Sequence, residues 1–250
     1  MPREDFLNLS VAILLRGIHY KENYTCQWTG KDHWKPLQDR RPELAAYTVD
    51  FEHIFAESFQ EAILNNLNTY DIFACTYPSP KKEPFLERYK PVDSLFIGED
   101  DRFGYEHTQC RGFQAGLEMI KAYAKKHNKK YDMVMCTRSD IGYRENFLDH
   151  VPLDEERMLA YYQWKVIKEW LSQGACSDWT MRGCHDSVHL FPYKIISDVI
   201  CAADQHANMP GHQESLHCLP ALLDKSLVHY ISHPDDHMWD GDGGLWVDRG

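Results

Sequence analysis

The feature of this sequence that most constrains its fold is a short apolar run, residues 133–136, which stops abruptly at the polar residues 137–140. A continuous apolar run with polar flanks is typical of a strand buried on both faces of a sheet. Ligands of open α/β sheets lie beyond the carboxyl ends of the strands. An acid at that edge, here Asp140, can hold a hard divalent cation, because such ions prefer carboxylate oxygen as a ligand. A solvated turn is the alternative interpretation.

Strands and helices alternate along the first 140 residues. Apolar runs predict strands at 11–15, 71–76 and 94–97, and amphipathic patterns predict helices over 50–67 and 111–126. The polar segment 18–49 is expected to be a long loop, and the Pro- and Lys-rich segment 78–91 is expected to break regular structure. This alternation predicts an α/β fold, with a largely parallel sheet and right-handed crossovers of the nucleotide-binding kind.

The pattern is looser beyond residue 140. Strands are predicted at 158–162, 188–191 and 228–231, and a helix is predicted around 195–203. A second helix is predicted over 214–223, with Pro220 either kinking it or marking its true first turn. The Gly-rich, acidic end of the chain is expected to be mobile.

Composition excludes some classes of partner. The formal net charge is −11, from 38 acidic residues against 27 Lys and Arg, which argues against nucleic acid as the main partner. No apolar run approaches the roughly 20 residues of a membrane span. The stretch 6–15 could pass for a signal-peptide core, but polar residues interrupt it and acids precede it, which favours a first core strand.

The 8 cysteines form no C-x-x-C pair, and several lie inside apolar runs. Buried thiols suit a reducing compartment, so a cytoplasmic location is expected. Cys176 and Cys184 could nevertheless form a disulfide. A structural zinc site built from these two residues with His185 and His189 is another alternative, although its spacing fits no standard finger.

Four blocks in the second half carry a resemblance to a known family. They are RGFQAGL at 111–117, CTRSDI at 136–141, GHQES at 211–215 and ISH at 231–233. In this order they resemble the metal-dependent GT-A glycosyltransferases, especially the β-1,4-galactosyltransferase type, over roughly residues 105–237. The soluble chain also resembles bacterial and large-virus enzymes that act on cytoplasmic or capsid glycans.

The resemblance implies roles for individual residues. Asp140 and His233 would bind the metal, and oxygen plus imidazole ligation suits Mn²⁺ better than Mg²⁺. Glu214 would be the catalytic base at the start of a helix. The chain departs from the family pattern at Arg138, which replaces the first acid of the Asp-x-Asp motif, and at Ser215, where Asp is usual. His233 as an ordinary loop histidine is the alternative.

Cations at the same sheet edge are expected to bind the donor. Arg16, Arg111 and Arg138 could hold a diphosphate through bidentate hydrogen bonds. Surface solvation is the alternative for Arg111, and a structural ion pair is the alternative for Arg138. The full expected donor-binding set is Leu15, Arg16, Gly17, Arg111, Arg138 and Ser139.

Two acids compete for the role of base, Glu214 first and Asp186 second. An ordinary helix N-terminal acid is the alternative for Glu214. Trp164 and Trp179 could stack on sugar rings, with core packing as the alternative, and His212 completes the expected acceptor-binding set.

These expectations describe one GT-A-like domain. Residues 1–143 would bind the nucleotide sugar, 144–238 would bind the acceptor, and 239–250 would form a flexible tail. The expected activity is Mn²⁺- or Mg²⁺-dependent transfer of a sugar from a UDP-sugar, with UDP-xylose or UDP-galactose as first candidates, to a glycan or glycoprotein acceptor. Inversion is favoured over retention. An inactive sugar-nucleotide or glycan binding module and a metal-dependent phosphoester hydrolase are the alternatives.

Overall fold

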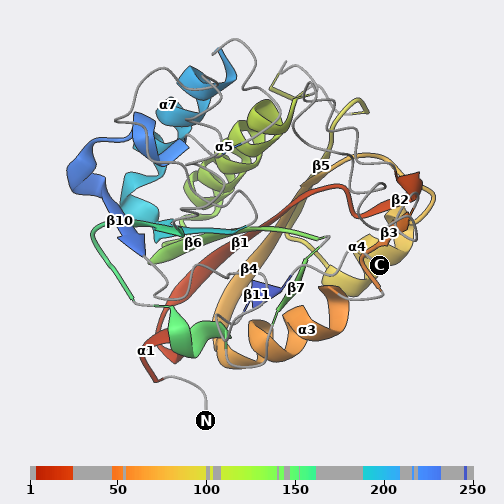
Figure 1. Ribbon diagram of the computed structural model, residues 1–250, viewed down its shortest axis with the longest axis horizontal. Coiled ribbons are helices and arrows are strands. Elements are labelled where there is room, and N and C mark those ends of the chain that lie inside the picture. Colours follow the sequence, from red (N-terminus) through yellow and green to blue (C-terminus); the bar gives the residue numbers. More distant parts are fainter. Residues whose placement is uncertain are drawn as a thin grey trace, which may run out of the picture.

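The computed structural model describes residues 4–24, 47–52, 55–99, 102–103, 108–139, 141–143, 147–151, 153–161, 188–208, 216, 219–231 and 245–246. In this part of the chain a twisted central sheet carries helices on both faces (Figure 1). Among the helices in these ranges, none combines the length and the apolar character that crossing a membrane requires.

Seven strands form the central sheet. In chain order they are β1 (Ser10–Gly17), β4 (Thr69–Thr76), β5 (Asp93–Phe96), β6 (Met133–Arg138), β8 (Met158–Tyr161), β9 (Val188–Pro192) and β10 (Val228–Ile231). Their order across the sheet is β10-β8-β9-β6-β1-β4-β5. β9 runs antiparallel to both of its neighbours, and the other pairings are parallel. The fold class expected for a GT-A-type chain, a mixed central sheet flanked by helices, is confirmed by this topology.

The helices are α1 (Glu4–Leu7), α3 (Phe55–Ala62), α4 (Lys82–Tyr89), α5 (Gln109–His127) and α7 (Ile196–Ala207). Short 3₁₀ turns lie at Leu64–Asn66, Phe147–His150, Tyr193–Ile195, Leu219–Leu222 and Lys225–Leu227. Two small antiparallel pairs complete the description, β2 (Tyr20–Tyr24) with β3 (Tyr47–Asp50) and β7 (Gly142–Tyr143) with β11 (Leu245–Trp246).

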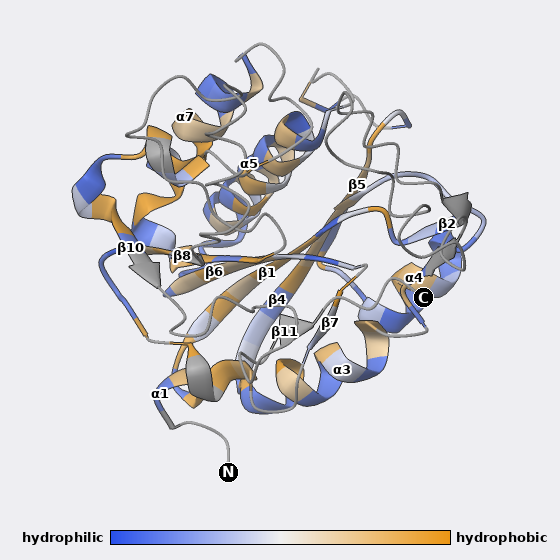
Figure 2. Cartoon of the chain, in the orientation of Figure 1, coloured by the Kyte–Doolittle hydropathy of each residue, from blue (hydrophilic) through white to orange (hydrophobic). Residues whose placement is uncertain are grey.

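The sheet is buried on both faces, which explains the continuous apolar runs. Along β1, Ala12 and Leu14 pack with α5 and α7, whereas Val11, Ile13 and Leu15 pack on the opposite side with α3. Figure 2 shows mostly apolar residues along the strands at the centre of the sheet. Each face therefore needs its own helical cover, and the strand must be apolar at every position.

Helix α5 begins and ends at the positions that its sequence favours. The Thr108 side chain accepts a hydrogen bond from the backbone N–H of Arg111 at 3.2 Å, and Lys125, Lys126 and His127 occupy the last turn. Acceptor side chains at the N-cap and cations at the C-terminus satisfy the unpaired backbone groups and the helix dipole. Gly116 lets the helix approach β1 closely, since a Cβ built there would lie 2.6 and 2.7 Å from the two Leu14 methyl carbons.

Three local predictions were wrong. The segment 78–91 contains helix α4, residues 18–49 contain β2 and most of β3, and Asp50 ends β3 instead of starting a helix. Helix α3 starts at Phe55. Of the predicted helix over 214–223, the described residues Leu219–Leu222 form a 3₁₀ turn that contains Pro220, and not the first turn of an α-helix.

Cys75, Cys110 and Cys136 are buried thiols, as expected, and Cys201 is exposed. The other four cysteines, including Cys176 and Cys184, lie outside the described residues.

Candidate functional site

The sheet topology marks one position as the candidate site. From β1 the chain moves outward through β4 to β5, and it then returns over α5 to β6 on the other side of β1. The next strand of the sheet after β1 is β4, on one side of the β1–β6 pair, and the next after β6 is β8, on the other side. Ligands of open α/β sheets bind in the crevice outside the carboxyl ends of the strands at such a switch point. The candidate site is thus the edge where β1 and β6 end.

Two arginines meet at this edge. Arg16 of β1 and Arg138 of β6 are direct register partners in the parallel pair. Arg16 is 2% exposed, and its guanidinium carbon lies 5.6 Å from the centre of the Phe113 ring of α5. Arg138 is half-buried. Two positive charges on neighbouring strands repel each other, and negative charge placed beside them lowers this repulsion.

The turn after β1 is held in an unusual backbone conformation. Gly17 has φ +83°, a backbone conformation that residues other than glycine rarely adopt. A Cβ there would lie 3.8 Å from Cγ of Arg138, so the dihedral angle, not lack of space, requires glycine. The Ser139 hydroxyl donates to the carbonyl of Ile18 at 3.4 Å. The ends of β1 and β6 are therefore bonded to each other beyond the last ladder pair.

Asp140, the expected metal ligand, lies outside the described residues, but the residues on both sides of it are fixed. Ser139 and Ile141 are each 1% exposed. Tyr143 of β7 bonds through its hydroxyl to that of Thr137, and its backbone N–H donates to the Ser58 hydroxyl of α3 at 3.1 Å. β6 and β7 thus hold both ends of a short connection that contains residue 140.

The second expected ligand, His233, also lies outside the described residues, two positions beyond the end of β10. β10 ends at the same edge as β6, since β9 alone runs the other way. Three strand steps separate β6 from β10, roughly 14 Å at the usual strand spacing. Among the described residues, no group of three or more His, Cys, Asp or Glu could hold a metal ion. A shared metal therefore requires the chain after β10 to turn toward β6.

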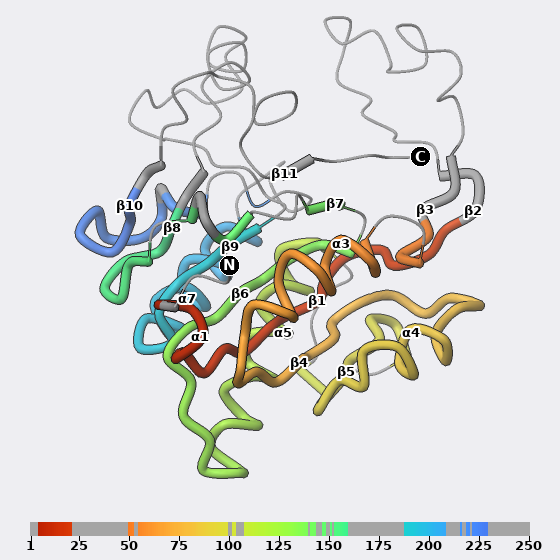
Figure 3. The backbone as a smooth tube through the Cα atoms, turned by 90° about the horizontal axis from the view of Figure 1, so that it is seen from below, coloured from red at the N-terminus to blue at the C-terminus, as the bar shows by residue number. Residues whose placement is uncertain are grey.

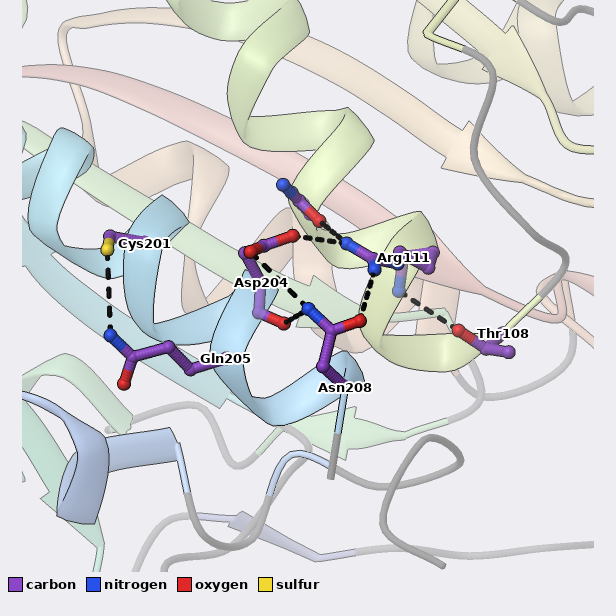
Figure 4. A network of polar contacts seen from close by, with 7 residues as sticks. Thr108, Arg111, Cys201, Asp204, Gln205 and Asn208 are labelled. Atoms are coloured by element: carbon purple, nitrogen blue, oxygen red, sulfur yellow. Dashed lines mark hydrogen bonds and ion pairs between the residues drawn. The ribbon is translucent and has the colours of Figure 1, made fainter. Parts of the chain in front are cut away.

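Arg111 lies in a network between two helices (Figure 4). Its guanidinium pairs with the Asp204 carboxylate of α7 at 2.5 Å, and it donates to the side-chain oxygens of Gln114 at 2.8 Å and Asn208 at 3.0 Å. These contacts join the start of α5 to the end of α7. They give Arg111 a structural role, and its donor-binding role stays a prediction.

The remaining expected site residues divide into two groups. Leu15 is fully buried in the α3-side core, so it can offer a ligand only its backbone. His189, from the zinc alternative, is fully buried in β9 with its ring 5.4 Å from that of Phe113. The expected catalytic and acceptor-binding residues and the rest of the zinc set lie outside the described residues: Asp186, Glu214, Trp164, Trp179, His212, Cys176, Cys184 and His185.

A buried cysteine lies close to the candidate site along β6. Cys136 lies in β6, two residues before Arg138, and is fully buried. Burial raises the pKa of its thiol, although the nearby Arg16 charge acts in the opposite direction. Because the thiolate is the nucleophilic form, Cys136 has a packing role.

His19 was missed by sequence reasoning. It follows Gly17 by two residues, is 1% exposed, and hydrogen-bonds Thr76 at the end of β4 and Ser79 beyond it. Burial lowers the pKa of its imidazole to about 4, against the charge of Asp50, which raises it. The one available signal was its position two residues after a strand that ends in Arg-Gly.

No family model and no curated protein matches the chain. Among solved structures it is similar to a cytidylyltransferase from Leptospira borgpetersenii, with 12% identity over 92% of this chain and 79% of that one, and a TM-score of 0.43. It is also similar to a glycosyltransferase involved in glycosylation of the major capsid of PBCV-1, with 10% identity over 90% and 81% of the two chains and a TM-score of 0.39. A third is the 4-diphosphocytidyl-2C-methyl-D-erythritol synthase of Anaerococcus prevotii, with 8% identity over 94% and 92% and a TM-score of 0.48. Likenesses at this level identify neither substrate nor mechanism.

Proposed function

We propose that this protein is a glycosyltransferase that moves a sugar from a nucleoside diphosphate, UDP in the first instance, to a hydroxyl group of a glycan or glycoprotein. The observation that carries the proposal is the register pair Arg16 and Arg138 at the switch point of the sheet. A diphosphate carries the charge that matches two adjacent guanidiniums, and Arg138, the more exposed of the pair, can bind phosphate oxygens bidentately. UDP-xylose and UDP-galactose are the first donors to test.

In the proposed reaction, the bond between the anomeric carbon and the β-phosphate oxygen breaks, and a bond to the acceptor oxygen forms. Negative charge develops on the leaving diphosphate, and fixed cations stabilise that charge without reorganising. Arg16 suits this role because packing against Phe113 and near-complete burial restrict its side chain. Arg138 is the more exposed partner, and a ligand can reach it from solvent.

The proton of the acceptor hydroxyl needs a base if the transfer inverts the anomeric centre. We assign Glu214 to this role, with Asp186 as the second choice. A carboxylate placed within hydrogen-bond reach of the hydroxyl contributes about 10²–10⁴ in rate. Trp164 and Trp179 are proposed sugar platforms, and His212 is proposed as a third acceptor-binding residue.

A divalent cation, Mn²⁺ or Mg²⁺, is proposed to bind at Asp140 and His233 and, when bound, to neutralise part of the diphosphate charge. The donor set suits a cation of this kind, since one carboxylate and one imidazole follow strands that end at the same edge. Asp140 is favoured because Thr137 and Tyr143, three residues before it and three after it in the chain, bond to each other, and Tyr143 also bonds to Ser58.

Calorimetric titration with UDP tests the proposal, first with Mn²⁺ and then with EDTA. Arg138→Gln is expected to weaken UDP binding about tenfold or more, because a charge-assisted, bidentate contact is lost. Arg88→Gln is the matched control, since Arg88 is an exposed arginine in the last turn of α4. Wild-type protein that does not bind UDP, or an Arg138→Gln variant that binds as well as the control, contradicts the proposal.

A turnover assay with UDP-xylose and UDP-galactose distinguishes an enzyme from a binding module. Tight UDP binding without sugar transfer or donor hydrolysis would favour the inactive module. The arginine at position 138, where the family pattern has an acid, is the observation that favours that second candidate.

A further inference from the structure

Three successive backbone carbonyls, at the last residue of β1 and the two residues after it, accept hydrogen bonds from three different parts of the chain. The carbonyl of Gly17 accepts from the Thr76 hydroxyl at 2.5 Å, and that of Ile18 accepts from the Ser139 hydroxyl at 3.4 Å. The carbonyl of His19 accepts from the backbone N–H of Phe51 at 2.9 Å. The turn 17–19 therefore joins the ends of β1, β4 and β6 to the residue that follows β3.

The side chain of His19 bonds to the hydroxyl group of Thr76, which is the donor to the Gly17 carbonyl. Its Nδ1 lies 2.8 Å from Oγ1 of Thr76, and its Nε2 lies 2.7 Å from Oγ of Ser79. Thr76 uses its single hydroxyl proton on the Gly17 carbonyl, so its oxygen must accept from Nδ1–H of His19. Nε2 then carries the lone pair and accepts from the Ser79 hydroxyl. One neutral tautomer of His19 satisfies every bond.

Packing holds the imidazole ring in this orientation. The ring centre lies 4.5 Å from that of Phe85, 6.1 Å from that of Phe51 and 6.4 Å from that of Phe96. The charged groups nearby are Asp50 at the end of β3 and Lys81 before α4, which pair at 2.5 Å. The Lys81 ammonium also pairs with Glu52 at 2.5 Å. The two carboxylates outnumber the single ammonium, and the charge of Asp50 favours a protonated imidazole. Burial among the aromatic rings outweighs that charge, and the ring remains neutral.

We infer that His19 is a positioning residue for the anion site, which acts through Thr76 to fix Gly17 in its left-handed conformation and so to aim Arg16 beside Arg138. Arg16 directly precedes the glycine whose carbonyl accepts from Thr76, so the conformation of Gly17 sets the direction in which the backbone continues from Arg16. The identity of the anion rests on the proposed function. His19 itself contacts neither the reacting atoms nor the diphosphate in this role.

The test compares UDP binding of four variants at 10 °C, after circular dichroism has confirmed that each is folded. His19→Phe keeps the ring packing and removes both hydrogen bonds, whereas His19→Asn retains a donor near the Nδ1 position. Thr76→Val removes only the hydroxyl and preserves the shape, and Thr76→Ser keeps the hydroxyl as its control. We expect about tenfold weaker UDP binding for His19→Phe and Thr76→Val, near wild-type binding for Thr76→Ser, and partial recovery for His19→Asn.

A double variant and a spectrum complete the design. Because His19 acts through Thr76, the pair His19→Phe and Thr76→Val should weaken binding no more than either change alone. Ring ¹⁵N chemical shifts of the wild type at pH 7 should show a protonated Nδ1 and an unprotonated Nε2.

Three outcomes would overturn the inference. They are a folded His19→Phe or Thr76→Val variant with wild-type UDP affinity, fully additive effects of the two changes, and the opposite tautomer in the spectrum. Wild-type protein that fails to bind UDP refutes the proposed function instead, whereas the tautomer still tests the hydrogen-bond network. The two failures are therefore distinguishable.

Discussion

Replacing Gly116 with alanine tests how closely helix α5 must approach strand β1. The new Cβ would lie 2.6 and 2.7 Å from the two methyl carbons of Leu14 and 3.2 Å from the Cγ of Leu14. Leu14 is fully buried and has little space to move. Overpacking of this kind costs about 1–3 kcal/mol, and the higher helix propensity of alanine offsets about 1 kcal/mol of it. Gly116→Ala should therefore lower the free energy of unfolding by up to about 2 kcal/mol, measured by urea denaturation.

Gly112 supplies the matched control on the same helix. A Cβ at Gly112 would meet one atom, the terminal Cδ1 of Ile97 at 2.7 Å, which side-chain rotation can move away. Gly112→Ala should consequently be close to neutral. Leu14→Ala normally costs about 2–5 kcal/mol in a core, and it should cost less in the Gly116→Ala background because it removes the clash. Equal stabilities of the two alanine variants, with no coupling to Leu14, would refute this account.

Three further changes give measurable outcomes. Stability should fall between about pH 6.5 and pH 4, because His19 binds a proton in the unfolded chain over this range, whereas burial lowers its pKa in the folded protein to about 4. The loss in the free energy of unfolding should be about 3 kcal/mol. Urea titrations of His19→Phe should show no such loss. Arg111→Gln should lower the free energy of unfolding by about 1 kcal/mol, because it breaks the network with Asp204. UDP affinity, measured by calorimetry, should stay unchanged if this network is the residue's role. A weakened affinity would instead support the donor-binding prediction. Deleting residues 244–250 removes β11, the partner strand of Gly142, and should reduce turnover more than thermal stability; unchanged turnover would exclude a role for this segment.

β11 pairs with β7, and Figures 1 and 3 show β7 close to the end of β6, at the candidate site. The register places Trp246 opposite Gly142, two residues beyond Asp140. Sequence patterns gave no indication of this pairing, because a two-residue strand has no measurable periodicity. The contact depends on the tertiary fold, which brings the end of the chain back to the sheet edge.

Long apolar runs were predictable because burial on both faces requires them. The same reasoning failed for α4, where prolines suggested an irregular segment. Pro84 lies in the first turn of that helix, where a missing N–H costs nothing, and Pro80 and Pro91 lie outside it. The decisive signal was the spacing of Phe85 and Tyr89, four residues apart and both buried. For α3, Phe51 matched the helical period, but it packs into the core from the turn after β3.

The candidate site was predictable to the extent that it follows from strand register. Arg16 and Arg138 each follow an apolar run by one or two residues, and parallel pairing of the two strands brings them together. His19 gave little signal because its partners, Thr76 and Ser79, are 57 and 60 residues away in the chain. Arg111 resembled a site residue in sequence, but the acceptors that surround it on α7 were not foreseeable from its own block.

The presence of Arg138 at this edge changes the electrostatics that the proposed reaction would use. A second acid there would repel a diphosphate until a cation neutralised it, whereas an arginine attracts the diphosphate directly and repels the cation. A single carboxylate at position 140 would also hold a divalent ion less strongly than a pair. The proposed enzyme should therefore retain part of its UDP affinity in EDTA, and the metal should affect turnover more than binding. This division follows from the placement of Arg138 beside Arg16, on a sheet edge that the His19 turn keeps fixed.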